Sequence, residues 1–183
     1  MTGSKAEAKP AVSATGTVRN VPRSATTGTL VGVKATSRRP GTIEGTQLYH
    51  LDPQERIAMI RQGIEASAIS NLSSRMGMSK ELLLSSLGLS RATISRKEKD
   101  ATVLSKDESE RVLGVEALIG MVQTMVEQSG NPSGFDAARW VSNWLSSPLP
   151  ALAGATPASY MDTFEGQKLV AELLSMSQSG AYA

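Results

Sequence analysis

The residue types best suited to chemistry in this 183-residue chain gather in one basic stretch, SRATISRKEK, between residues 90 and 99. Arginine can donate two hydrogen bonds to O6 and N7 of guanine in the major groove of DNA, and lysine suits phosphate. The N-terminus of a helix also favours phosphate through its dipole. We therefore predict DNA contacts from the outer side of a helix here, by Ser90, Arg91, Ala92, Ser95, Arg96 and Lys99.

The residues around this stretch have the spacing of a helix-turn-helix. The sequence predicts two short helices, 79–88 and 90–99, with Gly88 at the turn between them. Leu84, Leu89 and Ile94 are expected to face inward and hold the two helices at a fixed angle. An ordinary αα-hairpin with a solvated basic face remains the alternative to a unit that reads DNA.

Residues for catalysis or metal binding are sparse. The chain has no cysteine, which excludes disulfides, zinc–thiolate sites and cysteine nucleophiles, and its only histidine is His50. We find no HExxH, no GxSxG and no Gly-Lys-Ser/Thr phosphate loop. Asp162 and Glu165 flank Thr163, but carboxylates at a helix start usually complement the helix dipole. We predict that the protein is not an enzyme and needs no cofactor or metal.

The elements that must position the basic stretch are predicted to be all helical. Asp52 before Pro53 is typical of a helix start, and Ser105 with Glu108 matches a capping box that opens the longest helix. Apolar residues recur at helical spacing on three expected faces. These faces are Ile57, Ile60 and Ile64; then Ile64, Ala68, Leu72 and Met76; then Val112, Val115, Leu118, Ile119, Val122 and Val126.

The C-terminal third contains a stretch interrupted by prolines and glycines. After a turn at 130–134, a helix over 135–145 carries Trp140 and Trp144 at i, i+4 spacing, and we expect both to be in the core. Three prolines then make residues 146–157 a stiff connection that aims the last helix. Thr163 is placed to cap that helix. Its expected buried face is Leu169, Val170, Leu173 and Leu174.

Charge and composition set the N-terminus apart. Residues 1–45 hold seven basic and two acidic residues, a net +5, whereas the whole chain carries only +2. This segment is rich in Ser, Thr, Gly, Ala and Pro, so it cannot bury enough apolar surface to offset its ordering entropy. We expect a flexible, disordered basic arm, which either lies near a polyanion such as nucleic acid or is merely solvated.

These observations give three predicted regions: the arm (1–45), a helix-turn-helix domain (46–104) and a small C-terminal helical domain (105–183). No apolar run approaches the roughly 18 residues of a membrane span, and no signal-peptide core is found at the N-terminus. We therefore expect a cytoplasmic protein without membrane contacts. The helix-turn-helix also predicts a two-fold homodimer, because palindromic half-sites mirror the symmetry of the protein.

Taken together, three stretches resemble the Xre/MbcA/ParS antitoxins, the partners of RES-domain and related toxins. They are LGLSRATISRKEKDATVLSKDESERVLGVEALI, FDAARWVSNWLSSPLPALAGATPASYMDTFEGQKLVAELL and SGAYA. The order of motifs carries the resemblance: a helix-turn-helix, a Ser-Glu-Arg long helix, an Ala-x-x-Trp helix ending near Pro, an Ala-Leu-x-Gly-x-x-Pro loop, an Asp-Thr-x-x-Gly helix start and a Gly-x-Tyr tail. It covers roughly residues 53–183.

The resemblance implies an antitoxin of a type II toxin–antitoxin pair. Its C-terminal region would cover the active site of a NAD-degrading RES toxin, or of a related toxin that transfers ADP-ribose. Its helix-turn-helix would bind the promoter of its own operon, alone or with the toxin as corepressor, within a larger toxin–antitoxin assembly. The implied toxin contacts are Gly154, Thr156 and Pro157 in the loop; Asp162, Thr163 and Gly166 at the helix start; and Ser179, Gly180, Ala181, Tyr182 and Ala183 as a plug.

The chain departs from the family pattern at several positions. Ala153 stands where many relatives have a second glycine, Gly114 where an arginine is common, and Arg96–Lys97 where an arginine pair is common. The 45-residue arm is longer than the pattern needs. A stand-alone transcriptional regulator with a C-terminal dimerisation domain is the main alternative, and a structural adaptor without DNA binding is a further one.

Overall fold

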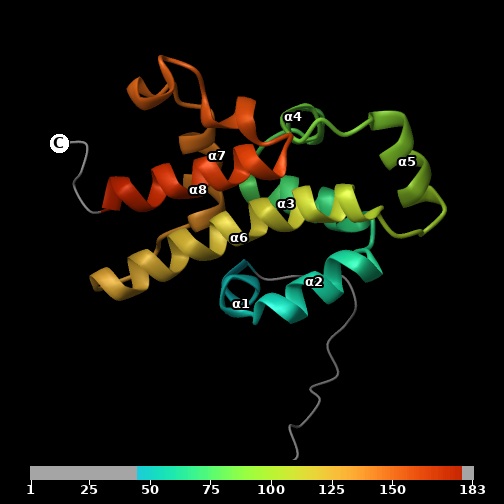
Figure 1. Ribbon diagram of the computed structural model, residues 1–183, viewed down its shortest axis with the longest axis horizontal. Coiled ribbons are helices and arrows are strands. Elements are labelled where there is room, and N and C mark those ends of the chain that lie inside the picture. Colours follow the sequence, from blue (N-terminus) through green and yellow to red (C-terminus); the bar gives the residue numbers. More distant parts are fainter. Residues whose placement is uncertain (1–44, 179–183) are drawn as a thin grey trace, which may run out of the picture. The chain divides into compact units, whose positions relative to one another are not determined.

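A computed structural model describes residues 45–178. This part of the chain contains eight α-helices, two 3-10 turns and no strand, so the all-α prediction is confirmed (Figure 1). The elements are α1 (Gly45–His50), α2 (Pro53–Gln62), α3 (Ser67–Met76), α4 (Lys80–Ser86), α5 (Arg91–Lys99), α6 (Lys106–Ser129), α7 (Ala137–Leu145), η1 (Pro150–Leu152), η2 (Pro157–Tyr160) and α8 (Phe164–Gln178). None of these helices is long and apolar enough to cross a membrane.

Most helices begin and end at the residues that the sequence indicates. The Asp52 carboxylate accepts the backbone N–H of Gln54, and Ser105 and Glu108 form both hydrogen bonds of a capping box. Gly77 ends α3 in the left-handed conformation, with φ of +64°. Capping side chains therefore account for where α2 and α6 begin, and the left-handed Gly77 accounts for where α3 ends.

The long helix α6 is the element around which the others pack. Helix α8 runs alongside it, α1 and α2 lie on its other side, and α7 also packs against it (Figure 1). Five of the six α6 residues predicted to face inward are buried, and Val126 is half-buried. Buried residues from Leu48 to Leu174 form one continuous hydrophobic cluster.

Helix α1 was not predicted, because residues up to 45 were assigned to the arm and no start signal precedes Asp52. Its crossing with α6 depends on two glycines. A Cβ added at Gly120 would lie 2.0 Å from the carbonyl oxygen of Gly45. The close approach buries Leu48 completely and places Nε2 of His50 3.1 Å from Oγ1 of Thr124. Tertiary contact rather than local sequence defines this short helix.

Several predictions of core residues and helix bounds are wrong. Trp140 is 39% exposed, Ile57 44% and Leu169 37%, although helical periodicity placed all three on buried faces. Ile64 is buried but precedes α3 instead of belonging to a helix, and α7 begins at Ala137 rather than at residue 135. Periodicity assigns a residue to a helix face, but it does not say how much of that face a neighbouring element covers.

One ion pair lies within this core. Arg75 of α3 donates two hydrogen bonds to the Glu116 carboxylate of α6, at 2.8 and 3.1 Å. Glu116 is only 4% exposed. A buried carboxylate of this kind depends on its partner, because an uncompensated charge in the interior is costly.

We predict that Arg75→Met lowers the free energy of unfolding by about 3–5 kcal/mol, because it leaves the Glu116 carboxylate buried without its partner. The double variant Arg75→Met/Glu116→Met should recover most of that loss, since an apolar pair replaces the ion pair. The exposed pair Arg139–Asp136 is the control, and Arg139→Met should cost under about 1 kcal/mol. Urea unfolding followed by circular dichroism measures all three. A double variant no more stable than Arg75→Met would contradict this account.

The dependence of stability on pH should have two opposite components. Burial raises the pKa of Glu116 above 4.5, although Arg75 acts to lower it. The stability that this group contributes is therefore present below pH 4.5 and is lost as the pH rises through the raised pKa. Burial also acts to raise the pKa of Glu108, but hydrogen bonds from Lys97 and Ser105 outweigh it and the pKa lies below 4.5. Its contribution is present above pH 4.5 and is lost as the pH falls through the lowered pKa.

We therefore expect Glu116→Gln to remove a decline in stability on the alkaline side of pH 4.5. Glu108→Gln should remove a decline on the acid side. Urea unfolding between pH 3 and 7 measures both. Parallel pH profiles for the wild type and Glu116→Gln would show that burial of Glu116 has no such effect.

Candidate functional site

The predicted helix-turn-helix consists of α4, a turn through Gly88 at φ of +60°, and α5. Leu84, Leu89 and Ile94 are all buried, as expected. Ser90 caps α5 by accepting the backbone N–H of Thr93. The six residues predicted to contact DNA, from Ser90 to Lys99, are all exposed. Their position fits a reading surface, while the DNA contacts themselves stay a prediction.

Charged residues on the inner side of α5 hold this helix against the rest of the unit. Glu98 pairs with Lys80 of α4 and accepts a 2.8 Å hydrogen bond from Ser70 of α3. Lys97 pairs with Glu108 in the capping box of α6. These contacts join α5 to three other helices, so its outer side is presented at a defined angle. On that outer side Arg91 makes an exposed ion pair with Glu81, at 3.3 Å.

The Ser-Glu-Arg sequence of α6 supports the helix-turn-helix from behind. Ser109 is fully buried and accepts the backbone N–H of Ile64 at 3.2 Å. Nη1 of Arg111 donates to the carbonyl oxygens of Leu87 and Gly88, at 3.1 and 3.3 Å. The turn between α4 and α5 is thus bound directly to the central helix. Sequence reasoning recognised the Ser-Glu-Arg motif but did not assign this task to Arg111.

The proline-rich stretch after α7 folds back on itself. The backbone N–H of Leu149 donates to Ala155, and that of Gly154 donates to Leu149, at 3.1 and 3.0 Å. Pro150 and Pro157 occupy the first positions of η1 and η2. Thr163 then accepts the N–H of Gly166 at 3.1 Å, which confirms its predicted capping role. The stretch is a compact connection that leads directly into α8.

The predicted partner-contacting residues of this half differ in accessibility. Gly154, Asp162 and Thr163 are exposed and Thr156 is half-buried, whereas Pro157 and Gly166 are buried. A Cβ at Gly166 would lie 1.9 Å from the Tyr160 carbonyl oxygen, so this glycine lets α8 approach η2. The plug residues, 179–183, and the arm up to residue 44 lie outside the described residues.

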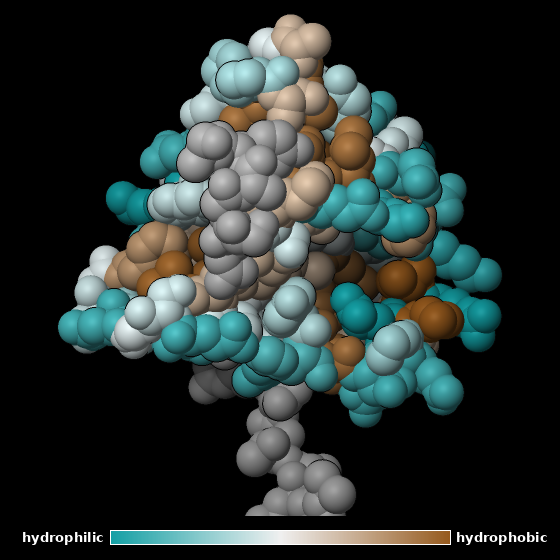
Figure 2. Space-filling view, turned by 60° about the vertical axis from the view of Figure 1, so that its left-hand side comes forward, coloured by the Kyte–Doolittle hydropathy of each residue, from teal (hydrophilic) through white to brown (hydrophobic). Residues whose placement is uncertain are grey.

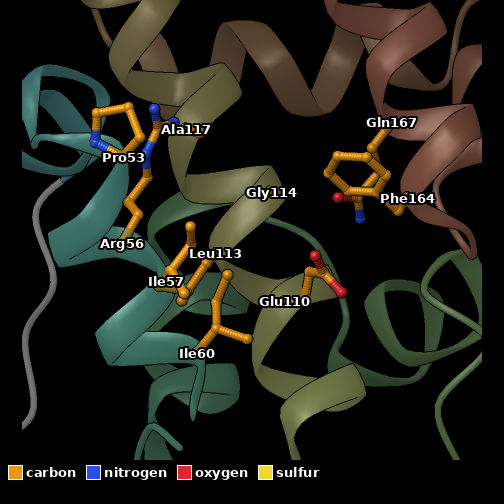
Figure 3. A pocket seen from close by; sticks show the side chains of 10 residues that line it. All are labelled: Pro53, Arg56, Ile57, Ile60, Glu110, Leu113, Gly114, Ala117, Phe164 and Gln167. Carbon is orange, nitrogen blue, oxygen red and sulfur yellow. The ribbon is translucent and has the colours of Figure 1, made fainter. Parts of the chain in front are cut away.

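A separate hollow of about 360 Å³ lies between α2, α6 and α8 (Figure 3). Its lining is mainly apolar and includes Ile57, Ile60 and Phe164, with Arg56 and Glu110 as charged members. Phe164 is 61% exposed. None of the predicted site residues lines this hollow.

Comparison with known proteins finds a family match in each half of the described chain. Residues 55–115 match the antitoxin Xre-like helix-turn-helix domain, and residues 135–180 match the antitoxin Xre/MbcA/ParS C-terminal toxin-binding domain. A "Prs ADP-ribosylating antitoxin" from Sphingobium sp. (strain YBL2) is 41% identical over 136 residues, which cover 74% of this chain and 86% of the relative.

The chain belongs to the Xre/MbcA/ParS antitoxin family. It is an antitoxin with a helix-turn-helix and a C-terminal toxin-binding domain. Helix α6 links the two matched regions. Its N-terminal part, up to residue 115, belongs to the matched helix-turn-helix domain, and its remaining residues lead toward the matched toxin-binding domain. The division of domains at residues 104 and 105 stays a prediction.

The structure gives physical reasons for features in which this antitoxin departs from its family pattern. A Cβ at Gly114 would lie 1.8 Å from Oε1 of Gln167, a buried residue of α8. Nε2 of Gln167 donates to the carbonyls of Arg111 and Met161, at 3.0 and 2.9 Å. Gly114 therefore makes room for an amide that binds α8 to α6. Lys97, at the second position of the family's arginine pair, forms an ion pair with Glu108.

Ala153, at the position where many relatives have glycine, adopts a left-handed backbone conformation with φ of +53°. A side chain in this conformation is strained by roughly 1–2 kcal/mol. We predict that Ala153→Gly raises the free energy of unfolding by about 0.5 kcal/mol, because relief of strain exceeds the added freedom of the unfolded chain.

The neighbouring Ala151 is the matched control for this substitution, since it is exposed and lies within η1. Ala151→Gly should lower stability by about 0.5–1 kcal/mol, because glycine there only gains freedom in the unfolded chain. Differential scanning calorimetry compares the two variants. If Ala153→Gly were as destabilising as Ala151→Gly, strain at Ala153 would be ruled out.

Proposed function

We propose that this antitoxin neutralises a RES-type, NAD-consuming toxin by covering its active site, and that it represses its own operon through α4 and α5. The observation that carries the proposal is the match of residues 135–180 to a toxin-binding domain, together with an exposed basic side on α5. In this account residues 179–183 enter the toxin's pocket, and the protein acts without catalysis of its own, in the cytoplasm where its operator is found.

The arrangement of the helices supports two binding surfaces that do not compete. Helix α5 lies at one end of the described unit and the C-terminal end of α8 at the opposite end (Figure 1). A toxin docked at the end of α8 would therefore leave α5 accessible to DNA. The two-fold dimer expected for a helix-turn-helix would present two such α5 helices to a palindromic operator.

The name of the Sphingobium relative bears on which reaction the toxin catalyses. That relative is called an ADP-ribosylating antitoxin, which directs attention to ADP-ribose transfer as well as to NAD degradation. Both reactions consume NAD, so an assay of NAD loss detects either one. Labelling of a protein acceptor from radioactive NAD would identify transfer, and free ADP-ribose would identify hydrolysis.

We predict that the two surfaces can be disabled separately. Deleting residues 179–183 should release toxin activity while operator binding stays within about twofold of wild type. Arg91→Ala/Arg96→Ala should weaken operator binding by about 1–3 kcal/mol for each lost base contact, while toxin inhibition is unchanged. The control variant is Arg61→Ala, which removes an exposed arginine of α2.

The probes are the product of the adjacent reading frame, assayed for NAD consumption, and the promoter fragment, assayed by fluorescence anisotropy. Full inhibition by the deletion variant would contradict the plug. Unchanged sequence-specific binding by the arginine variant would contradict the choice of α5 as the reading helix. Specific DNA binding combined with no effect on the neighbouring protein would favour a stand-alone regulator.

A further inference from the structure

The end of α8 lies beside a pair of tryptophans on α7 that reach the surface. Trp140 and Trp144 stack nearly parallel, with ring centroids 6.2 Å apart and an interplanar angle of 11°. Trp140 is 39% exposed and Trp144 is half-buried. Exposed tryptophan is unusual on a surface that stays in water, and tryptophan is among the residues most enriched at the energetic centres of protein interfaces.

A shallow apolar hollow lies on each side of this pair. One, of about 210 Å³, is lined by Trp144, Leu149, Pro150 and Leu173. The other, of about 260 Å³, is lined by Trp140, Phe135, Val126 and Leu174. Ser177, one residue before the last described residue of α8, lines both. Figure 2 looks at the side on which α8 ends and shows hydrophobic residues reaching the surface there among hydrophilic ones.

The wall of the first hollow is held in shape before any partner binds. Pro150 has a fixed φ, and the hydrogen bonds between Leu149 and the pair Gly154 and Ala155 close the loop that carries it. The two tryptophans likewise restrict each other's rotation by stacking. A preorganised surface loses little entropy on binding, which favours association.

The proposed function says what covers this surface. Residues 179–183, assigned to the toxin's pocket, follow Gln178 directly. Five residues span at most about 17 Å, so the mouth of that pocket must lie within this distance of the end of α8. Because Ser177 lines both hollows, they lie within reach of the toxin's rim around that mouth. The first hollow lies wholly within the region matched by the toxin-binding domain, and half of the residues that line the second lie within it.

We propose that the Trp140–Trp144 pair and its two flanking hollows form the main docking surface for the rim of the toxin's active site. The partner segment it fits is apolar, with side chains that enter the hollows on either side of the tryptophans. The tail then blocks the pocket, while the tryptophan surface supplies most of the affinity. This inference rests on the proposed function and adds where the toxin is held.

The hollow between α2, α6 and α8 provides the comparison surface. Phe164 on that hollow is more exposed than Trp140, yet it lies at the start of α8, fourteen residues before Gln178. At 1.5 Å per residue the two positions are about 21 Å apart along the helix, beyond the reach of the tail. Loss of apolar area at Phe164 therefore tests whether position, and not exposure alone, decides toxin binding.

The test measures the affinity of the full-length antitoxin for the product of the adjacent reading frame by biolayer interferometry. We expect Trp140→Ala to raise the dissociation constant by about 30-fold or more, as for an interface hot spot. Ala151→Arg, which puts a charged side chain at the edge of the first hollow, should raise it at least about tenfold without touching the core. Phe164→Ala should stay within about threefold. Thermal unfolding and operator affinity confirm that each variant is folded.

The outcomes separate this inference from the proposed function. If the wild type does not bind the neighbouring protein, both fail. If the wild type binds and Trp140→Ala and Ala151→Arg bind equally well, the docking surface is wrong and the proposed function stands. If Trp140→Ala instead converts a dimer to a monomer in analytical ultracentrifugation with toxin affinity unchanged, a second copy of this chain covers the surface and the inference is overturned.

Discussion

The position of Arg111 near the N-terminal end of α6 is the constraint on which both functional halves depend. Its guanidinium donates to the carbonyls that form the turn between α4 and α5, and its own carbonyl accepts the amide of Gln167 from α8. One residue thus fixes the helix-turn-helix and the last helix to the same turn of α6. The packing is close, since a Cβ at Gly88 would lie 3.2 Å from Cβ of Asp162. Neither half can shift far without disturbing contacts of the other.

Local sequence was sufficient to predict those parts of the fold that depend on hydrogen bonds near in sequence. The caps at Asp52, Ser105 and Thr163 satisfy backbone groups within three residues, so their helices begin where the pattern indicates. The inward positions of the helix-turn-helix were predicted for the same reason, because a short pair of helices with a fixed turn leaves few alternatives. The family resemblance is likewise confirmed by the matched domains and the Sphingobium relative.

Features set by distant contacts could not be predicted. Helix α1 depends on the approach of Gly45 to Gly120, 75 residues away, and Gly114 is explained only by the amide of Gln167. The spacing of Trp140 and Trp144 placed them correctly on one face of α7. It could not show that Trp140 stays 39% exposed among the described elements. This exposure is what makes the pair available to a partner.

The central claim is that this antitoxin restrains a NAD-consuming toxin, and co-expression tests it most directly. The reading frame adjacent to this gene would be expressed with and without the antitoxin, and cellular NAD measured alongside purification of the pair. We expect NAD to fall only when the antitoxin is absent, and the two proteins to purify as a stable complex. Unchanged NAD in both cultures, with no complex formed, would contradict the account and leave the protein as a DNA-binding regulator.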